Sequence, residues 1–385
     1  MKIHYFDFVA TGGVHTTFNS AMIEVLNKVY PGNEGIILHS EKEHGKIVQE
    51  KCESEIEVKK LKLLFSKIIH FSKIRDLFAI NFILPTMIKA SRDDVMYVGL
   101  AFPFSIHFIN FFSKILKKHV FITLHGELQY FLPCDKRYIQ IQHKKYFCSI
   151  RNCLTKENKY ITFVILGEPI YKAVSSVFKD NKNIIVINHP AIFSSDSNNH
   201  NRAHHPLTIG IIGGGLERKG VESIFKVAGF LKEEILQNKV LLKICGLYSG
   251  KTENENKNLV SYFDKVLSET ELEKEIQNLD YSFQFSTDSI CKAIASGTFI
   301  DSLIFEKPVI GLHSSYLDFY CPKDYPLFDS EQEIAEKIKK YISVSDDEFY
   351  KKDLDMTVQI RKQFSVDYNA QLFKKQMEFL FKCQH

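Results

Sequence analysis

The chain has 385 residues, of which 45% are hydrophobic and 25% charged, a balance typical of a globular protein rather than a disordered one. No apolar run reaches the roughly 18–20 residues that a membrane-spanning helix needs. The net charge of +4 is shared unevenly, with 26 Lys and Arg against 17 Asp and Glu in residues 1–190 and 24 against 29 in the remainder. A basic first half joined to an acidic second half favours an anionic partner for the first half.

The N-terminus and the cysteines indicate the compartment. Residues 1–13 lack the long apolar core and cleavage site of a signal peptide and predict a first β-strand. The eight cysteines are scattered, with no CxxC pair, which predicts reduced thiols and no structural zinc. We therefore expect a cytoplasmic protein without a metal site.

Strands and helices alternate along the first half. Short apolar segments bounded by turn residues predict strands, and apolar residues at intervals of three or four predict helices. We expect strands at 2–9, 34–39, 94–100, 119–124, 160–166 and 183–187, and helices beginning at Thr16 or Thr17 and covering 104–116 and 170–178. The polar segment 194–206 lacks apolar periodicity and predicts a linker.

The second half repeats this plan. We expect strands at 207–212, 240–245, 263–267, 281–285 and 309–311, and helices at 221–231, 270–279, 299–305 and 368–381. The pattern predicts an α/β fold with two Rossmann-like, doubly wound domains facing across a cleft. The expected boundaries are an N-terminal domain at 1–190, a linker at 191–206, a C-terminal domain at 207–363 and a helix at 364–385.

A glycine-rich turn follows the first strand of each half. The first turn contains Gly12 and Gly13, and the second contains Gly214 and Gly215. Glycines at these places let backbone amides approach a phosphate or a sugar, although a simple tight turn is the alternative. The first turn reads GGVH rather than GxGxxG, so we expect no dinucleotide fingerprint there.

Polar groups also follow strands further along. His125 stands beside Gly126 at the end of strand 119–124, the edge where α/β sheets bind ligands, which favours a functional role. Ser296, Gly297 and Thr298 lead into helix 299–305, and helix N-termini attract anions. An ordinary αβ unit without a ligand is the alternative for 286–311.

The segment 59–92 is aromatic, apolar and basic, with eight Lys and Arg against one Asp. Such a stretch is typical of a peripheral contact with an anionic membrane surface. A pair of core-facing helices with solvated lysines is the alternative. Nucleic acid is disfavoured as a partner, because the segment has no recognised reader motif and the other half is acidic.

Taken in order, several motifs resemble those of a known family. They are GGVH at 12–15, HGE at 125–127, INHP at 187–190, IGGGLERKG at 212–220 and SGTFIDSLIFEKPVIG at 296–311. Together they resemble retaining glycosyltransferases of the GT-B fold, family 4, over nearly the whole chain. The resemblance rests on the order and spacing of the motifs rather than on any one of them.

This resemblance implies a hexosyltransferase with a nucleotide-sugar donor, UDP or GDP being favoured, and no cofactor or metal. The acceptor would be a saccharide or a lipid-linked saccharide in bacterial surface polysaccharide synthesis, reached at the inner face of the plasma membrane. The C-terminal helix would cross back to the N-terminal domain, which would bind the acceptor, while the C-terminal domain would bind the donor.

The resemblance also implies roles for individual residues. His125 would lie beside the transferred sugar, and Arg218 and Lys219 would neutralise the donor diphosphate. Asp301 would bond the nucleotide ribose. Further donor contacts would come from Gly12, Gly13, Gly214, Gly215, Ser296, Gly297 and Thr298.

The sequence departs from the family pattern at two places. Ala293 stands where the first Glu of the E-x7-E pair is expected, and glycine, Gly214 or Gly215, replaces an arginine in the basic turn. Arg218 is the candidate to compensate for that arginine. Asp288 is a candidate carboxylate near the sugar.

Three alternatives stay open. An inverting GT-B transferase would need a general base, for which His15 and Glu127 on the acceptor side are candidates. A nucleotide-sugar 2-epimerase would act without an acceptor. A non-catalytic nucleotide-sugar-binding relative would account for Ala293.

Overall fold

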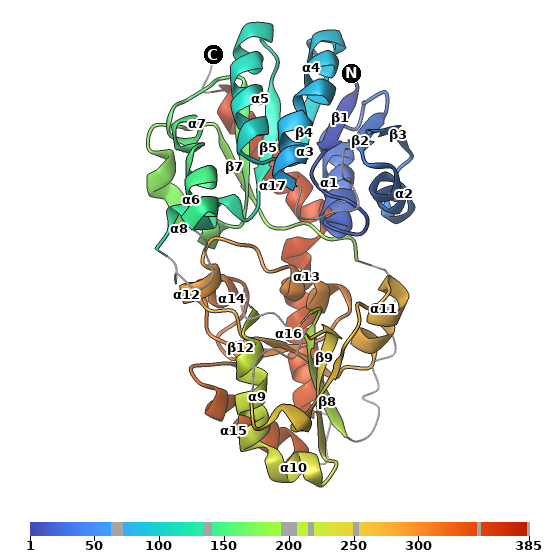
Figure 1. The fold of residues 1–385 in the computed structure, drawn as a ribbon, viewed down its shortest axis with the longest axis vertical. Helices are drawn as coiled ribbons and strands as arrows, with labels where there is room; N and C mark the ends of the chain where they lie inside the picture. The colour runs from blue at the N-terminus through green and yellow to red at the C-terminus, as the bar shows by residue number, and fades with distance from the viewer. Residues whose placement is uncertain are drawn as a thin grey trace. The chain divides into compact units, whose positions relative to one another are not determined.

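The computed structural model describes residues 1–62, 72–133, 141–193, 206–214, 219–248, 254–344 and 348–382. The chain divides into two compact units. The first comprises residues 1–192, 293–295 and 363–385, and the second comprises 193–292 and 296–362. Each unit has a parallel sheet with helices on both faces (Figure 1).

The first unit has a seven-stranded parallel sheet in the order β3-β2-β1-β4-β5-β6-β7. Six of its strands are mainly apolar, as expected for strands that are covered on both faces, whereas the edge strand β3 carries Glu57, Lys59 and Lys60 and is largely exposed. They are β1 (Ile3–Asp7), β2 (Ile36–Ser40), β3 (Ile56–Lys60), β4 (Val95–Leu100), β5 (Val120–Leu124), β6 (Ile161–Leu166) and β7 (Ile184–Ile187).

Helices cover both faces of this sheet. They are α1 (Thr16–Val29), α2 (Lys42–Lys51), α3 (Ser72–Phe78), α4 (Ile80–Lys89), α5 (Pro103–Leu116), α6 (Ile141–Cys148), α7 (Arg151–Thr155), α8 (Glu168–Phe178) and α17 (Val366–Lys382), with a 3₁₀ turn η2 (Glu127–Phe131). Figure 1 shows α4 and α5 side by side in front of the sheet and α17 behind it.

The C-terminal helix belongs to the first unit, as predicted. Helix α17 packs on α1 and on β7, and Phe373 is fully buried in the core that it shares with them. The Gln376 side chain pairs with the edge strand, because its Nε2 donates to the Val186 carbonyl at 2.6 Å and its Oε1 accepts from the Val186 N–H at 2.9 Å. This pairing satisfies backbone groups that an edge strand would otherwise leave open.

The second unit has a six-stranded parallel sheet in the order β10-β9-β8-β11-β12-β13. Its strands are β8 (Leu207–Ile212), β9 (Val240–Leu247), β10 (Val260–Phe263), β11 (Tyr281–Gln284), β12 (Val309–Leu312) and β13 (Leu327–Phe328). Its helices are α9 (Val221–Phe230), α10 (Lys232–Leu236), α11 (Glu269–Gln277), α12 (Asp288–Cys291), α13 (Gly297–Ile304), α14 (Ser315–Tyr320), α15 (Glu331–Ser343) and α16 (Glu348–Phe364), with a 3₁₀ turn η4 (Lys257–Leu259).

The predicted alternation of strands and helices, and with it the α/β fold, is confirmed. One predicted strand, 263–267, was wrong, because the chain pairs with β9 at Val260–Phe263 and has left the sheet by residue 264. Of the basic segment 59–92, residues 63–71 lie outside the described part. The rest forms the end of β3, helix α3 and helix α4.

Candidate functional site

Both sheets have a switch point at their first strand. The chain runs from β1 outward to β2 and β3, then returns to β4 on the other side, and β8 has the same relation to β9, β10 and β11. Ligands of open α/β sheets bind outside the carboxyl ends of the strands at such a point. There are therefore two candidate sites: a first-unit site at the ends of β1, β5 and β7, and a second-unit site at the ends of β8, β9 and β11.

The turn after β1 is open to a ligand. Gly12 has a φ of 56°, in the left-handed region that favours glycine, and a Cβ added to Gly12 or Gly13 would meet nothing within 4 Å. The turn ends at His15, which has a φ of 60° and precedes the first residue of α1. Gly12 and Gly13 thus border open space, as a turn that binds a ligand requires.

A buried polar network fixes this turn from below. Nδ1 of His44 lies 2.8 Å from the Gly12 carbonyl oxygen and therefore donates to it, while Nε2 accepts from the Asn19 amide at 2.9 Å. The same amide donates to Asp7 at 2.6 Å, and Asp7 accepts the N–H of Ala10 at 2.9 Å. Asp7, Asn19 and His44 are fully buried, so the network determines the backbone path from residue 7 to residue 12.

His125 lies at the carboxyl end of β5, as predicted, and is held in one tautomer. Its Nε2 lies 2.8 Å from the Gly99 carbonyl oxygen and must donate to it, which leaves Nδ1 as an acceptor in the neutral ring. Burial, and next the nearby His15 and His189, hold the His125 pKa well below its usual value. His125 is therefore a neutral imidazole at physiological pH.

Aromatic contacts connect three strand ends around Phe18. The Phe18 ring meets His125 edge-on at 4.6 Å between centroids and His189 at 5.1 Å, and His15 meets His125 at 4.8 Å. Burial lowers the pKa of His15, and it lowers that of His189 to about 4. The sequence indicated His15 and His125, but the position of His189 beside them follows only from the fold.

Glu127 is a buried carboxyl beside this cluster. Its Oε2 accepts the backbone N–H of His125 at 2.7 Å, and the residue is 3% exposed. Burial, with a smaller contribution from Asp76, raises its pKa to about 7 against the lowering effect of the backbone hydrogen bonds. A carboxyl with this pKa exchanges a proton near neutral pH, which a general acid or base requires.

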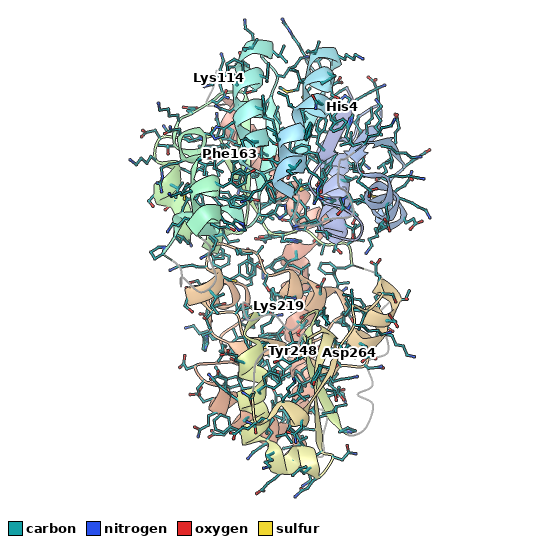
Figure 2. All side chains as sticks on the ribbon, viewed as in Figure 1. His4, Lys114, Phe163, Lys219, Tyr248 and Asp264 are labelled. Carbon is teal, nitrogen blue, oxygen red and sulfur yellow. The ribbon has the colours of Figure 1, made fainter. Side chains whose placement is uncertain are left out.

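In the second-unit site, glycines bring two strand ends together. Gly246, at the end of β9, has a φ of 157°, and a Cβ there would lie 2.6 Å from the carbonyl carbon of Gly213. A Cβ on Gly213 would in turn lie 2.9 Å from Nζ of Lys219, which also donates to the Ile212 carbonyl at 3.3 Å. Lys219 thus extends over the glycine turn after β8 (Figure 2).

The N-terminus of α13 lies at the end of β11. Ser296 caps the helix by accepting the N–H of Phe299 at 3.2 Å. The hydroxyls of Ser296 and Thr298 donate to Oε1 of Gln284 at 3.3 and 3.1 Å. Nε2 of Gln284 is buried without a partner in the described part of the chain, so the site retains an unsatisfied donor beside a helix N-terminus.

The carboxylate candidates differ in their surroundings. Asp301 lies one turn into α13, on the partly exposed side that it shares with Gly297 and Thr298. Asp288 is engaged on both oxygens by Ser315, whose N–H donates to Oδ1 at 2.9 Å and whose hydroxyl donates to Oδ2. Asp288 therefore orients the start of α14, a role that its loop position in the sequence did not indicate.

Burial accounts for the alanine at position 293, where the family pattern has a glutamate. It is completely buried and its N–H donates to Oε1 of Gln129 at 2.7 Å, so a glutamate side chain would need space that the fold does not provide. Gln129 resembles Gln284 in that its Nε2 is buried without a described partner. The sequence analysis did not identify either glutamine. The only sequence feature that they share is a position at or just after the end of a strand.

The structure places the predicted residues in two groups. Gly12, Gly13, His15, His125 and Glu127 lie at the first-unit site. Gly214, Lys219, Ser296, Gly297, Thr298 and Asp301 lie at the second-unit site, while Gly215 and Arg218 are outside the described residues. Among the described residues, no cluster of three or more His, Cys, Asp or Glu is arranged to hold a metal ion.

Two doubly wound units, each with a parallel sheet that reverses its strand order at its first strand, define the class of fold. Comparison with solved structures identifies it as the GT-B fold. Anabaena HepE in complex with UDP-glucose is 13% identical, with a TM-score of 0.62 over 99% of this chain and 100% of that chain. The pneumococcal O-GlcNAc transferase GtfA, in complex with UDP and GlcNAc, is 10% identical, with a TM-score of 0.61 over 99% of both chains.

A third similar structure is the lipopolysaccharide outer core galactosyltransferase WaaB, which is 12% identical with a TM-score of 0.56 over the full length of both chains. No family model and no curated protein matches the sequence. The GT-B fold predicted from the motif order is therefore confirmed by structure.

Proposed function

We propose that the protein is a glycosyltransferase that moves a sugar from a nucleotide diphosphate to a saccharide or lipid-linked saccharide acceptor, with retention. The observation that carries the proposal is the second-unit site. There, the N-terminus of α13, with Ser296 and Thr298 held in place by their hydrogen bonds to Gln284, forms a cradle of backbone N–H donors at a switch point. Such a cradle suits a diphosphate.

UDP is the first candidate nucleotide and GDP the second. HepE and GtfA, which share the fold, are described in complex with UDP-glucose and with UDP and GlcNAc. In this chain Asp301 would bond the ribose, and Lys219 with Arg218 would neutralise the diphosphate. Gly214, Gly215 and Gly297 would let the backbone approach it, with Gly12 and Gly13 near the sugar.

The chemistry needs no protein nucleophile. The developing charge on the leaving diphosphate is stabilised by Lys219 and by the helix N-terminus, which act as fixed positive charge. The departing phosphate oxygen takes the proton from the acceptor hydroxyl as the new glycosidic bond forms on the same face. Neutral His125, with Nδ1 as an acceptor, would receive a hydrogen bond from a sugar hydroxyl.

We also propose which part of the chain binds each substrate and where the protein works. Residues 1–190 would bind the acceptor and 207–363 the donor, and the protein would work in the cytoplasm on surface polysaccharide. A lipid-linked acceptor would bring the chain to the inner face of the plasma membrane, which fits the basic first half. In the described part of the chain, no helix is both long enough and apolar enough to cross a bilayer.

One observation favours the inverting alternative, because Glu127 is a buried carboxyl with a pKa of about 7 beside His125. In that mechanism Glu127 would take the acceptor proton directly. The anomeric configuration of the product, read by proton NMR at early times, separates the two mechanisms. Turnover of the donor without an acceptor would indicate the 2-epimerase, and the absence of any turnover would indicate the non-catalytic relative.

The first test is a thermal-shift screen with UDP, GDP, ADP, dTDP and CMP. A nucleotide at 100 times its Kd stabilises the folded protein by about 2.7 kcal/mol, which corresponds to roughly 5–10 °C for a unit of this size. We expect one diphosphate to give this shift in the wild type. Lys219→Gln and Asp301→Ala should each lose most of it.

Lys232→Gln is the matched control, because Lys232 is an exposed lysine on α10 of the same unit. It removes the same charge away from the second-unit site and should keep the full shift. If no diphosphate raises the Tm, or if Lys232→Gln loses the shift as Lys219→Gln does, the proposed donor site is wrong.

A further inference from the structure

The outer side of α5 carries large apolar side chains that the described part of the chain leaves uncovered. Phe104, Phe111 and Ile115 are 40%, 59% and 58% exposed. Their spacing of seven and four residues places them on one side of the helix, opposite Ile106 and Ile109, which are buried. The exposed stripe is therefore a second apolar face on a helix whose first face already packs on the sheet.

Helix α4 extends this surface. It packs beside α5 (Figure 1), and Ile88 on it is 61% exposed, while Phe78, just before it, is 38% exposed. Phe78, Ile88, Phe104, Phe111 and Ile115 together form what we call the α4–α5 face. A cluster of large exposed apolar side chains on neighbouring helices marks a contact surface rather than ordinary surface scatter.

Charge restricts what this face can contact. Neither α4 nor α5 contains an acidic residue. The cations on these helices and immediately after them are Lys89, Arg92, Lys114, Lys117 and Lys118. Asp93 and Asp94 follow Arg92, so the border has five cations against two carboxylates and is positive overall. An apolar stripe with a positive border complements a surface that is apolar inside and anionic outside, and an anionic lipid bilayer has that structure.

A cavity on the flank of the stripe fits a phosphate. It measures about 250 Å³, lies between α5 and α7, and is lined by His107, Asn110, Lys114, Asn152, Cys153 and Lys156, with no carboxylate among them. Figure 2 shows Lys114 beside the outer turns of α5. His107 and Lys114 each immediately precede a residue of the apolar side, Phe108 and Ile115, so the cavity adjoins the stripe.

His107, an uncharged group of the cavity, already has polar neighbours on both ring nitrogens. Nδ1 of His107 lies 3.4 Å from the Cys153 sulfur and its Nε2 lies 3.3 Å from the Ser149 hydroxyl. Lys114 and Lys156 are exposed and supply the positive charge. The cavity thus places two lysines beside the apolar stripe, where a lipid headgroup would lie above it.

We propose that the α4–α5 face docks on an anionic phospholipid bilayer, with Phe111 and Ile115 in the acyl boundary and a lipid phosphate in the cavity at Lys114 and Lys156. At 1.5 Å per residue, the stripe from 104 to 115 is about 17 Å long and would lie in the plane of the interface. The contact is placed on α4 and α5 rather than on segment 59–92 as a whole. It does not depend on the proposed transferase activity.

The test is co-sedimentation of the full chain with vesicles of phosphatidylcholine containing about one third phosphatidylglycerol, compared with pure phosphatidylcholine. We expect binding to the anionic vesicles and little to the neutral ones. Phe111→Ser with Ile115→Gln should lower the partition coefficient by roughly tenfold or more. Lys114→Gln and Lys156→Gln should lower it by about fivefold each on anionic vesicles.

Two matched controls use exposed residues of α17 in the same unit. Phe379→Ser removes a phenylalanine that is 69% exposed, and Lys374→Gln with Lys375→Gln removes two exposed lysines. Both should bind vesicles as the wild type does. Circular dichroism and the Tm of every variant establish that it is folded, and Ile115→Gln alone serves if the double variant is not.

Three results would overturn the proposal: no vesicle binding by the wild type, equal loss in the α17 controls, or equal binding to neutral vesicles. A dimer that Phe111→Ser dissociates, without vesicle binding, would instead show that a second copy covers the face. The vesicle experiment contains no nucleotide, so its result does not depend on the donor site. Either proposal can therefore fail without affecting the test of the other.

Discussion

Replacing Glu127 with glutamine should make the protein more stable at neutral and alkaline pH. The Glu127 carboxyl is buried, and its pKa is raised to about 7. A glutamine is of nearly the same size, carries no charge, and retains an oxygen that can accept the His125 N–H now bonded at 2.7 Å. The substitution therefore removes the ionisation and leaves the packing in place.

The magnitude follows from linkage between protonation and folding. In the unfolded chain Glu127 ionises near its usual pKa of 4.5, whereas in the folded chain it stays protonated until about pH 7. The stability associated with this group is fully present below pH 4.5 and is lost as the pH rises through 7. A difference of about 2.5 pKa units corresponds to a loss of roughly 3 kcal/mol by pH 8.

Urea unfolding of the wild type and Glu127→Gln at half-unit steps from pH 4 to pH 8.5 measures this. The difference in unfolding free energy should be small near pH 4, grow between about pH 4.5 and 7, and level off above that. His125 and His189, whose pKa values burial lowers, are present in both proteins, so their own titration should affect both equally. A pH-independent difference would refute the raised pKa, and a variant that is less stable at pH 8 would show that the carboxylate is solvated or paired.

Three further substitutions test the geometry that supports the two sites. Gly246→Ala should lower the unfolding free energy by about 2–3 kcal/mol in urea unfolding, because Gly246 has a φ in the left-handed region and an added Cβ would overlap backbone atoms. Gly297→Ala is the control and should change the unfolding free energy little, because a Cβ there would meet nothing within 4 Å. His44→Ala should cost about 2–4 kcal/mol, since it leaves a cavity and buried polar groups without a partner. Gln376→Ala should cost about 2 kcal/mol and speed amide hydrogen exchange at Val186, because the edge strand loses both side-chain hydrogen bonds.

The sequence was enough to predict the alternation of strands and helices, although strands β3 and β13 and helix α2 were not among the expected elements. Strand and helix periodicities are local, and the proline and glycine positions that end each element are local too, so the alternating plan of both halves could be read directly. The one misplaced strand, at 260–263 rather than 263–267, lies at the edge of the second sheet, where pairing with β9 rather than local pattern decides its extent.

The sequence also indicated which strand ends carry candidate groups. Parallel strands bring their carboxyl ends to one edge, so Gly12, His125 and Glu127 could be expected at one site and Lys219 and Ser296 at another. These assignments rest on topology, which follows from the alternation of strands and helices. Their catalytic and binding roles stay predictions until the substitutions above are made.

Only the tertiary structure decided the burial and the hydrogen-bond partners of each group. The Asn19 amide joins Asp7 and His44, which are 12 and 25 residues away, and the pairing of Gln129 with Ala293 spans 164 residues. The raised pKa of Glu127, the tautomer of His125 and the capture of Asp288 by Ser315 all depend on such distant neighbours. Burial and hydrogen bonding are set by what the rest of the chain brings into contact, and local sequence patterns carry no information about that.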